Sequence, residues 1–251
     1  MKLGAQLFSL RDYCETPDKL LNCLQEVKKM GYDCVQASGI CTIDANLLKN
    51  YIDEVGIPVT CTHRPFDEIC DNTDFCIDFH KTIECNVIGL GSMPGEYRNT
   101  YEGLVEFKNK IVEPIKKIKA AGLTFAYHNH AFEYETRDGV EIYDYITNEL
   151  PDIDFIHDVY WSTYAGKDPE YYIRTLAAAK RLNHVHFKDM KEPPQGAICA
   201  CGDGVIDFAH LYDVCRDVGI EYVYVEQDNA PTLGGLAEMQ KSYTHIRKIM
   251  K

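Results

Sequence analysis

Short, mostly apolar runs alternate along this chain with longer segments in which apolar residues recur at helical spacing. The first apolar run covers residues 3–10. Within residues 17–31, Leu20 and Leu24 lie four positions apart, as on one face of a helix. Thr16, which precedes a proline, is a typical helix N-cap. This first pair of segments therefore predicts a strand followed by a helix.

The same alternation continues along the whole chain and predicts eight strands, each followed by a helix. The predicted strands cover residues 3–10, 32–38, 59–63, 87–93, 124–130, 155–161, 183–189 and 222–228. The predicted helices cover residues 17–31, 44–55, 74–85, 101–121, 139–150, 169–180, 207–218 and 236–250. Regular alternation of this kind indicates a parallel sheet covered by helices.

Eight such units in 251 residues favour a closed (β/α)8 TIM barrel of the α/β class over an open, doubly wound sheet. No Pro- or Ser-rich linker separates the units, so we expect residues 1–251 to form a single TIM-barrel domain. The first strand-to-helix turn lacks a GxGxxG motif, which argues against a dinucleotide-binding fold. In a TIM barrel all strand ends open onto one face, and active sites lie there.

The composition excludes several classes of function and leaves the predicted fold unchanged. The formal net charge of −13 argues against binding of nucleic acid or of an anionic membrane surface. No apolar run reaches the roughly 18 residues that a membrane span needs. The 11 cysteines are scattered and odd in number, and no secretory signal precedes the first strand, so we expect reduced thiols and a cytoplasmic protein.

Carboxylates lie at the ends of two predicted strands. Glu226 follows the β-prone run at 222–225, and Asp158 lies within the run at 155–161, where a strand disfavours aspartate. A carboxylate inside a barrel mouth is unfavourable unless it is paired or bound to a metal. Both therefore indicate function, although an exposed strand end also explains Glu226. Trp161 either lies against the face of a bound sugar or packs against other side chains of the protein.

Imidazoles lie at the ends of two further strands. His184, His186 and Lys188 share one strand face, because residues two positions apart point the same way. His128 and His130 share a face for the same reason. We expect the two strands to deliver imidazole and ammonium groups to one pocket.

Glu133 follows the fifth strand closely, and the third strand ends in His63 and Arg64, which suit a polyol or an anionic group. Carboxylates and imidazoles from separate strands would converge at the barrel mouth, and together they form a ligand set for a divalent metal. The residue pattern therefore predicts a metal-dependent enzyme. Its candidate substrate contacts are Trp161, His128, His63, Arg64 and His184.

Six motifs are distributed along the chain. They are residues 127–134 (YHNHAFEY), 158–161 (DVYW), 165–169 (AGKDP), 186–189 (HFKD), 202–207 (GDGVID) and 225–228 (VEQD). On these motifs the chain resembles the sugar phosphate isomerase/epimerase family of xylose isomerase-like TIM barrels, over essentially its whole length.

The resemblance implies one divalent metal ion, which is Mn, Co, Zn or Mg. Its ligands would be an acid after strand five, Asp158, His186 and Glu226. In many members of the family the first ligand is a glutamate within strand five, but this chain has no glutamate there. The predicted substitute is Glu133, with His128 or His130 as the alternative.

The resemblance also implies an isomerase or epimerase that acts on a small carbohydrate, which is a sugar, a sugar phosphate or a cyclitol. The reaction would be proton abstraction next to a carbonyl through a metal-stabilised enediolate. Glu226 is the leading base, Glu133 or His130 its partner, and Lys188 holds a substrate oxygen. The alternatives are a lyase, similar to inosose dehydratase or a 3-keto-glycoside eliminase, and a catalytically inactive sugar-binding barrel. A homo-oligomer is compatible with the sequence.

Overall fold

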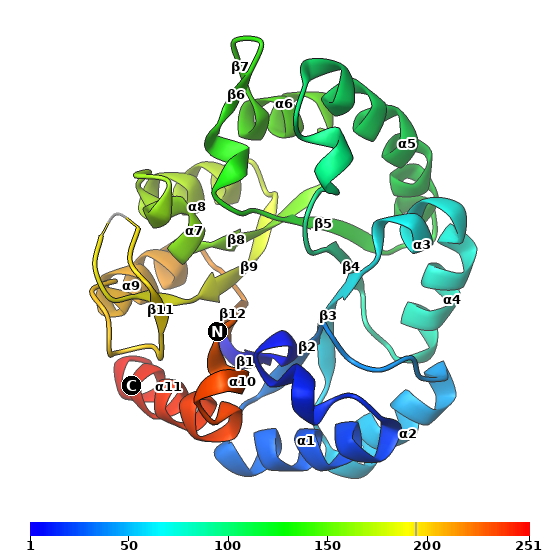
Figure 1. Cartoon of the computed structure of the whole chain (residues 1–251). Helices are drawn as coiled ribbons and strands as arrows, with labels where there is room; N and C mark the ends of the chain where they lie inside the picture. Colours follow the sequence, from blue (N-terminus) through cyan, green and yellow to red (C-terminus); the bar gives the residue numbers. More distant parts are fainter. Residues whose placement is uncertain (194) are drawn as a thin grey trace.

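Eight parallel strands close into a barrel in the computed structural model, which describes residues 1–193 and 195–251 (Figure 1). Each barrel strand pairs with the next barrel strand along the chain, and the last pairs with the first. The barrel strands are β1 (Lys2–Gln6), β2 (Cys34–Ala37), β3 (Val59–Arg64), β4 (Val87–Leu90), β5 (Thr124–His128), β8 (Asp154–Asp158), β9 (Leu182–Phe187) and β12 (Tyr222–Val225). The predicted TIM barrel is confirmed.

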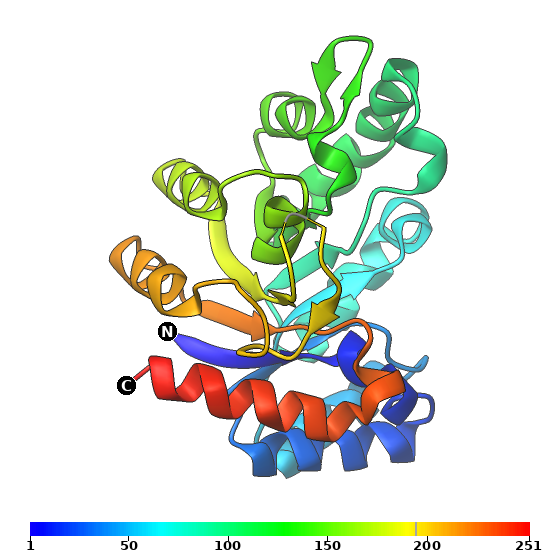
Figure 2. The same cartoon turned by 60° about the vertical axis from the view of Figure 1, so that its left-hand side comes forward.

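Helices surround the barrel, and both chain termini lie at the end of the barrel where β1 begins (Figure 2). The α-helices are α1 (Pro17–Met30), α2 (Ala45–Val55), α3 (Phe66–Asp71), α4 (Thr73–Thr82), α5 (Tyr101–Ala120), α6 (Ile142–Glu149), α7 (Val159–Tyr164), α8 (Pro169–Ala178), α9 (Phe208–Asp217), α10 (Ala230–Leu233) and α11 (Gly235–Ile249). Within the described residues, no helix combines the length and apolarity needed to cross a membrane.

Shorter elements decorate the loops. They are the 3-10 helices η1 (Leu7–Tyr13), η2 (Gly95–Tyr97) and η3 (Phe132–Tyr134), and the strand pairs β6 (Thr136–Arg137) with β7 (Val140–Glu141) and β10 (Asp189–Met190) with β11 (Ile198–Cys199). The sequence pattern predicted neither α3 nor the β6–β7 pair, and β7 occupies the first residues of the helix predicted at 139–150.

Helix ends follow local sequence signals. The side chain of Thr16 accepts a hydrogen bond from the backbone N–H of Lys19 and so caps α1. Gly31 ends that helix with a φ of 102°, a left-handed conformation that glycine adopts without strain. Asp207 caps α9 by accepting from the backbone N–H of His210. These helices therefore begin and end where the sequence predicts, within one or two residues.

Several strands end a few residues before their predicted ends, and in two of them a helix begins inside the predicted strand. The first strand stops at Gln6, whose side chain accepts from the backbone N–H of Phe8 and starts η1. The sixth stops at Asp158, whose carboxylate accepts from two backbone amides at the start of α7. The prediction that Trp161 lies in a strand is therefore wrong, because this cap turns the chain into a helix.

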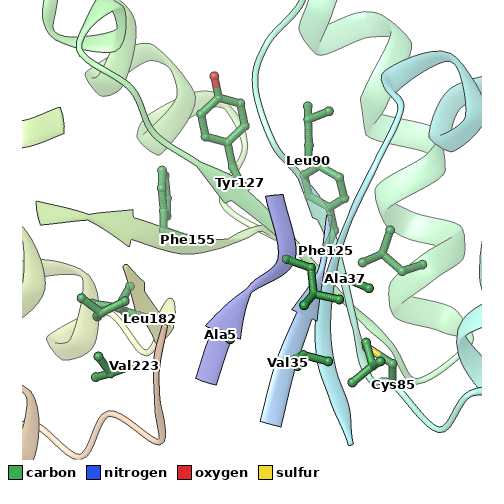
Figure 3. Close-up of a cluster of buried hydrophobic side chains, with 14 of the residues drawn as sticks. Ala5, Val35, Ala37, Cys85, Leu90, Phe125, Tyr127, Phe155, Leu182 and Val223 are labelled. Carbon is green, nitrogen blue, oxygen red and sulfur yellow. The ribbon is translucent and has the colours of Figure 1, made fainter. Parts of the chain in front are cut away.

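Along each barrel strand, successive side chains point alternately towards the surrounding helices and towards the barrel interior. Tyr127 packs against Phe107 of α5, and Phe155 packs against Tyr143 of α6. Both strand residues, labelled in Figure 3, therefore lie on the side of the sheet that faces the helices. Inside the barrel lies an apolar layer of Cys34, Cys61, Val87, Ala126, Ile156 and Tyr224. Residues two positions further along these strands point inward at the mouth, and there all of them except Gly89 are polar. This inward layer contains Gln36, His63, His128, Asp158 and Glu226.

Candidate metal centre

Four side chains from four strands converge just above the apolar layer. His128 and Asp158 end β5 and β8, His186 lies in β9, and Glu226 follows β12. All four are buried, and one nitrogen or oxygen atom of each lies within 4.8 Å of the corresponding atoms of the others. Among residues 1–193 and 195–251, no other group of three or more His, Cys, Asp or Glu side chains meets in this way.

Hydrogen bonds orient both imidazoles so that a ring lone pair faces the centre of the group. His128 Nδ1 lies 3.0 Å from the carbonyl oxygen of Gly91, and His186 Nε2 lies 2.6 Å from Gln36 Oε1. Both oxygens accept hydrogen bonds, so these two nitrogens carry the hydrogens. The other nitrogens, His128 Nε2 and His186 Nδ1, are left as potential metal ligands.

Two of the converging atoms are buried without a hydrogen-bond partner among the residues that the structure describes. Asp158 Oδ1 caps α7, but Asp158 Oδ2 has no partner, and neither has His128 Nε2, which lies 3.4 Å away. His186 Nδ1 lies 3.0 Å from Glu226 Oε2, and two lone pairs at this distance repel unless a proton or a cation lies between them. A cation bound by all four side chains would satisfy these atoms, so the residues fit a divalent metal.

The charge around the group also favours a divalent cation. Lys188 Nζ lies 2.7 Å from Asp228, 3.5 Å from Glu226 and 3.8 Å from Asp158. Three carboxylates face one ammonium, which leaves an excess of two negative charges when all are ionised. Burial alone would raise the pKa of Glu226, but the Lys188 ammonium outweighs it and holds that pKa well below its usual value.

Glu133, the predicted first ligand, does not join this group. Its Oε1 accepts a hydrogen bond from the hydroxyl of Tyr127, and its Oε2 accepts from the backbone N–H of His130, both at 2.7 Å. Tyr127 faces the helices, so the carboxyl braces the turn after β5 outside the barrel interior. Burial raises the pKa of Glu133 to about 7, against these hydrogen bonds. His128, the predicted alternative, takes its place in the group.

A cavity of about 430 Å³ lies at the barrel mouth, and His128 and Glu226 of the group line it. Its lining also includes the apolar side chains of Phe8, Phe66 and Leu90 and the polar side chains of His63, His130, Lys188 and Asp228. Burial lowers the pKa of both His63 and His130 well below the usual range, so both rings are neutral. Such a combination of apolar and polar walls suits a small polyol.

Four predicted substrate contacts lie at or beside this cavity, and His128, already described in the group of four, lines it. His63 and Arg64 line it, but Arg64 Nε lies 2.7 Å from Glu68 Oε1, so its charge is already paired. Trp161 lies beside the cavity, with the ammonium of Lys188 4.8 Å from its ring centroid. Trp161 therefore holds Lys188 against the carboxylates.

The structure does not bring His184 to the cavity. Its ring stacks on Tyr222 at 5.0 Å and lies parallel to Tyr224 at 5.8 Å, one layer deeper in the barrel than His186. Residues two apart do share a strand face, but they lie about 7 Å apart along the strand. The shared face therefore delivers His186 and Lys188 to the site and leaves His184 below it.

Two residues of the site were missed from the sequence. Gln36 is the polar residue of the short strand β2 and is fully buried, a combination that signals a specific hydrogen-bond role. Asp228 lies two positions after Glu226, on the same side of the chain, and contacts Lys188. The alternation of strand side chains was the available signal for Asp228.

Fold and site together define a TIM barrel with a candidate metal centre at its mouth. The chain belongs to the family of xylose isomerase-like TIM barrels, whose model matches residues 24–249. No curated protein matches the sequence.

Three solved structures illustrate the range of proteins that share this fold. A sugar phosphate isomerase/epimerase from Parabacteroides distasonis superposes with a TM-score of 0.80 at 20% identity, over 100% of this chain and 96% of that one. A probable 3-DHS dehydratase from Bacillus anthracis gives 0.75 at 12% identity, over 98% and 99%. D-Psicose 3-epimerase from Clostridium cellulolyticum gives 0.71 at 18% identity, over 100% of both chains. At these identities the likeness shows the fold.

Proposed function

We propose that this chain is a divalent-metal-dependent isomerase or epimerase that acts on a small carbohydrate. The observation that carries the proposal is the convergence of His128, Asp158, His186 and Glu226 beside a cavity of about 430 Å³. Two of the converging atoms are buried and have no hydrogen-bond partner in the described part of the chain. A bound Mn, Co, Zn or Mg ion would supply the Lewis acidity that stabilises an enediolate next to the substrate carbonyl.

Glu226 is the proposed base. Its Oε2 faces the other three ligand residues, which leaves Oε1 for the substrate in the cavity. Lys188 keeps this carboxylate ionised and therefore able to take a proton from the carbon next to the carbonyl. Lys188 also lines the cavity, where it holds a substrate oxygen.

His130 is the proposed partner of Glu226, because its neutral ring lines the cavity while Glu133 faces away from it. Return of the proton to the opposite face of the same carbon gives an epimer. Return of the proton to the neighbouring carbon interconverts an aldose and a ketose.

Solvent exchange tests the proposal. The metal-loaded protein is incubated with a panel of ketoses, aldoses and keto-cyclitols in D₂O, and loss of C–H signals is followed by proton NMR. We expect exchange with at least one substrate, and a rate lower by about 10²–10⁴-fold in Glu226→Gln. Glu133→Gln is the matched control and keeps the rate, because that carboxyl lies outside the cavity. An undiminished rate in Glu226→Gln would remove Glu226 from the mechanism.

The same experiment separates the two alternatives. Exchange accompanied by release of water or of an aglycone identifies a lyase. A protein that binds no metal and exchanges no C–H hydrogen with any sugar of the panel is a sugar-binding barrel without catalysis.

A further inference from the structure

We propose that the metal centre prefers Zn²⁺ and the neighbouring late transition ions over Mg²⁺ and Mn²⁺, and that His128 is the residue that sets this preference. The inference rests on the proposed function only in taking the four converging side chains as a metal site.

The donor set is half imidazole. His128 and His186 each direct a ring nitrogen at the group, together with one oxygen each from Asp158 and Glu226. Imidazole nitrogen suits Zn, Co, Ni and Fe, whereas Mg and Mn prefer carboxylate, carbonyl and water oxygens. A carboxylate in place of His128 would leave a single nitrogen donor and shift the preference towards the harder ions.

Both imidazoles are fixed before any metal binds. His128 is held by the carbonyl of Gly91 and His186 by the side chain of Gln36, with distances of 3.0 and 2.6 Å. These partners determine the tautomer and the ring orientation, and such outer contacts commonly change metal affinity by about 10–100-fold. The two nitrogen donors are therefore ready to bind without reorganisation.

Lys188 weakens the attraction of the site for hard cations. Its ammonium lies 3.5 Å from Glu226 and 3.8 Å from Asp158, so it partly neutralises both of the oxygen ligands. Binding of Mg²⁺ and Mn²⁺ depends mainly on carboxylate charge, whereas coordination by a neutral imidazole does not. The arrangement therefore penalises hard ions more than Zn²⁺.

The spacing of the ligand atoms suits a small ion. Four separations between a nitrogen and an oxygen of the group are 3.0, 3.4, 3.9 and 3.9 Å. Four ligands at about 2.1 Å from a common centre, the bond length of Zn²⁺ to nitrogen and oxygen, are about 3.4 Å apart in a tetrahedron. Calcium, with longer bonds and six to eight ligands, does not suit the group.

Metal titrations test the inference without reference to activity. The chelator-stripped protein is titrated calorimetrically with Zn²⁺, Co²⁺, Mn²⁺ and Mg²⁺, and the ratio of the Mn²⁺ and Zn²⁺ dissociation constants is compared between variants. Most sites bind Zn²⁺ more tightly than Mn²⁺, so the change in this ratio is the decisive quantity. We expect His128→Glu to lower the ratio at least about tenfold. His210→Gln, which removes an exposed imidazole paired with Glu170, is the control and leaves it unchanged.

The outcomes separate the inference from the proposed function. An unchanged ratio in His128→Glu overturns the inference alone, whereas wild-type protein that binds none of the four ions overturns the proposed metal site. If circular dichroism shows that His128→Glu does not fold, His128→Gln decides instead, because it removes the nitrogen donor without adding charge. That variant should lose more affinity for Zn²⁺ than for Mn²⁺, and equal losses refute the role of His128.

Discussion

Replacement of Glu133 by glutamine is expected to change how the stability of this protein depends on pH. The carboxyl is fully buried between the hydroxyl of Tyr127 and the backbone N–H of His130. Glutamine fits the same contacts, because its amide oxygen accepts from His130 and its amide nitrogen donates to the Tyr127 hydroxyl, which can also accept. The substitution therefore removes a titrating group with little change in packing.

The size of the effect follows from the pKa of Glu133, which is about 7 in the folded chain compared with 4.5 for an unperturbed glutamate. The folded state binds this proton more tightly than the unfolded state does. The stabilisation is therefore complete below pH 4.5 and is lost as the pH rises through 7. The total loss is about 3 kcal/mol, at roughly 1.4 kcal/mol for each tenfold change in proton affinity.

Urea unfolding of wild-type and Glu133→Gln protein, both stripped of metal and measured from about pH 4 to pH 8, gives this quantity directly. The difference in unfolding free energy is expected to move by about 3 kcal/mol in favour of the variant across this range. Other titrating groups cancel in the difference. Glu135→Gln, at an exposed position two residues further, is the control and should show no such trend. A difference that stays constant with pH would refute the inference that burial raises the pKa of Glu133.

Three further substitutions test the contacts that hold His186 and the loop after β9 in place. Gln36→Leu removes the acceptor that orients His186 and is expected to weaken metal binding by about 10–100-fold in calorimetry, with an unchanged circular dichroism spectrum. Asp189→Asn is expected to lower the unfolding free energy by about 1–3 kcal/mol in urea, because this buried carboxylate accepts from four backbone amides. Gly204→Ala places a Cβ 2.3 Å from Asp189 Oδ1, and thermal unfolding should reveal a loss of about 1–3 kcal/mol. An unchanged value in any of these assays contradicts the role given to that contact.

The barrel and most of the site were predictable from the sequence because they depend on periodicities that local residues carry. Apolar runs and helical spacing specify eight β/α units, and caps such as Thr16 and Asp207 place the helix boundaries. Closure of the barrel then brings the carboxyl ends of all strands to one face. That is why Asp158, His186 and Glu226, which lie far apart along the chain, were correctly expected to meet.

Only the tertiary structure decided between His128 and Glu133 as the fourth member of the group. The choice depends on which residue of β5 faces inward and on the path of the turn after it. Tyr127 faces the helices, and its hydroxyl donates a hydrogen bond to Glu133, so Glu133 lies on the helix side as well. The partners of the two imidazoles are Gly91, which follows β4, and Gln36, which lies in β2, and no spacing within one strand predicts contacts with other parts of the barrel. Local sequence thus determined the elements and their inward faces, whereas packing between elements determined which inward side chains converge at the mouth of the barrel.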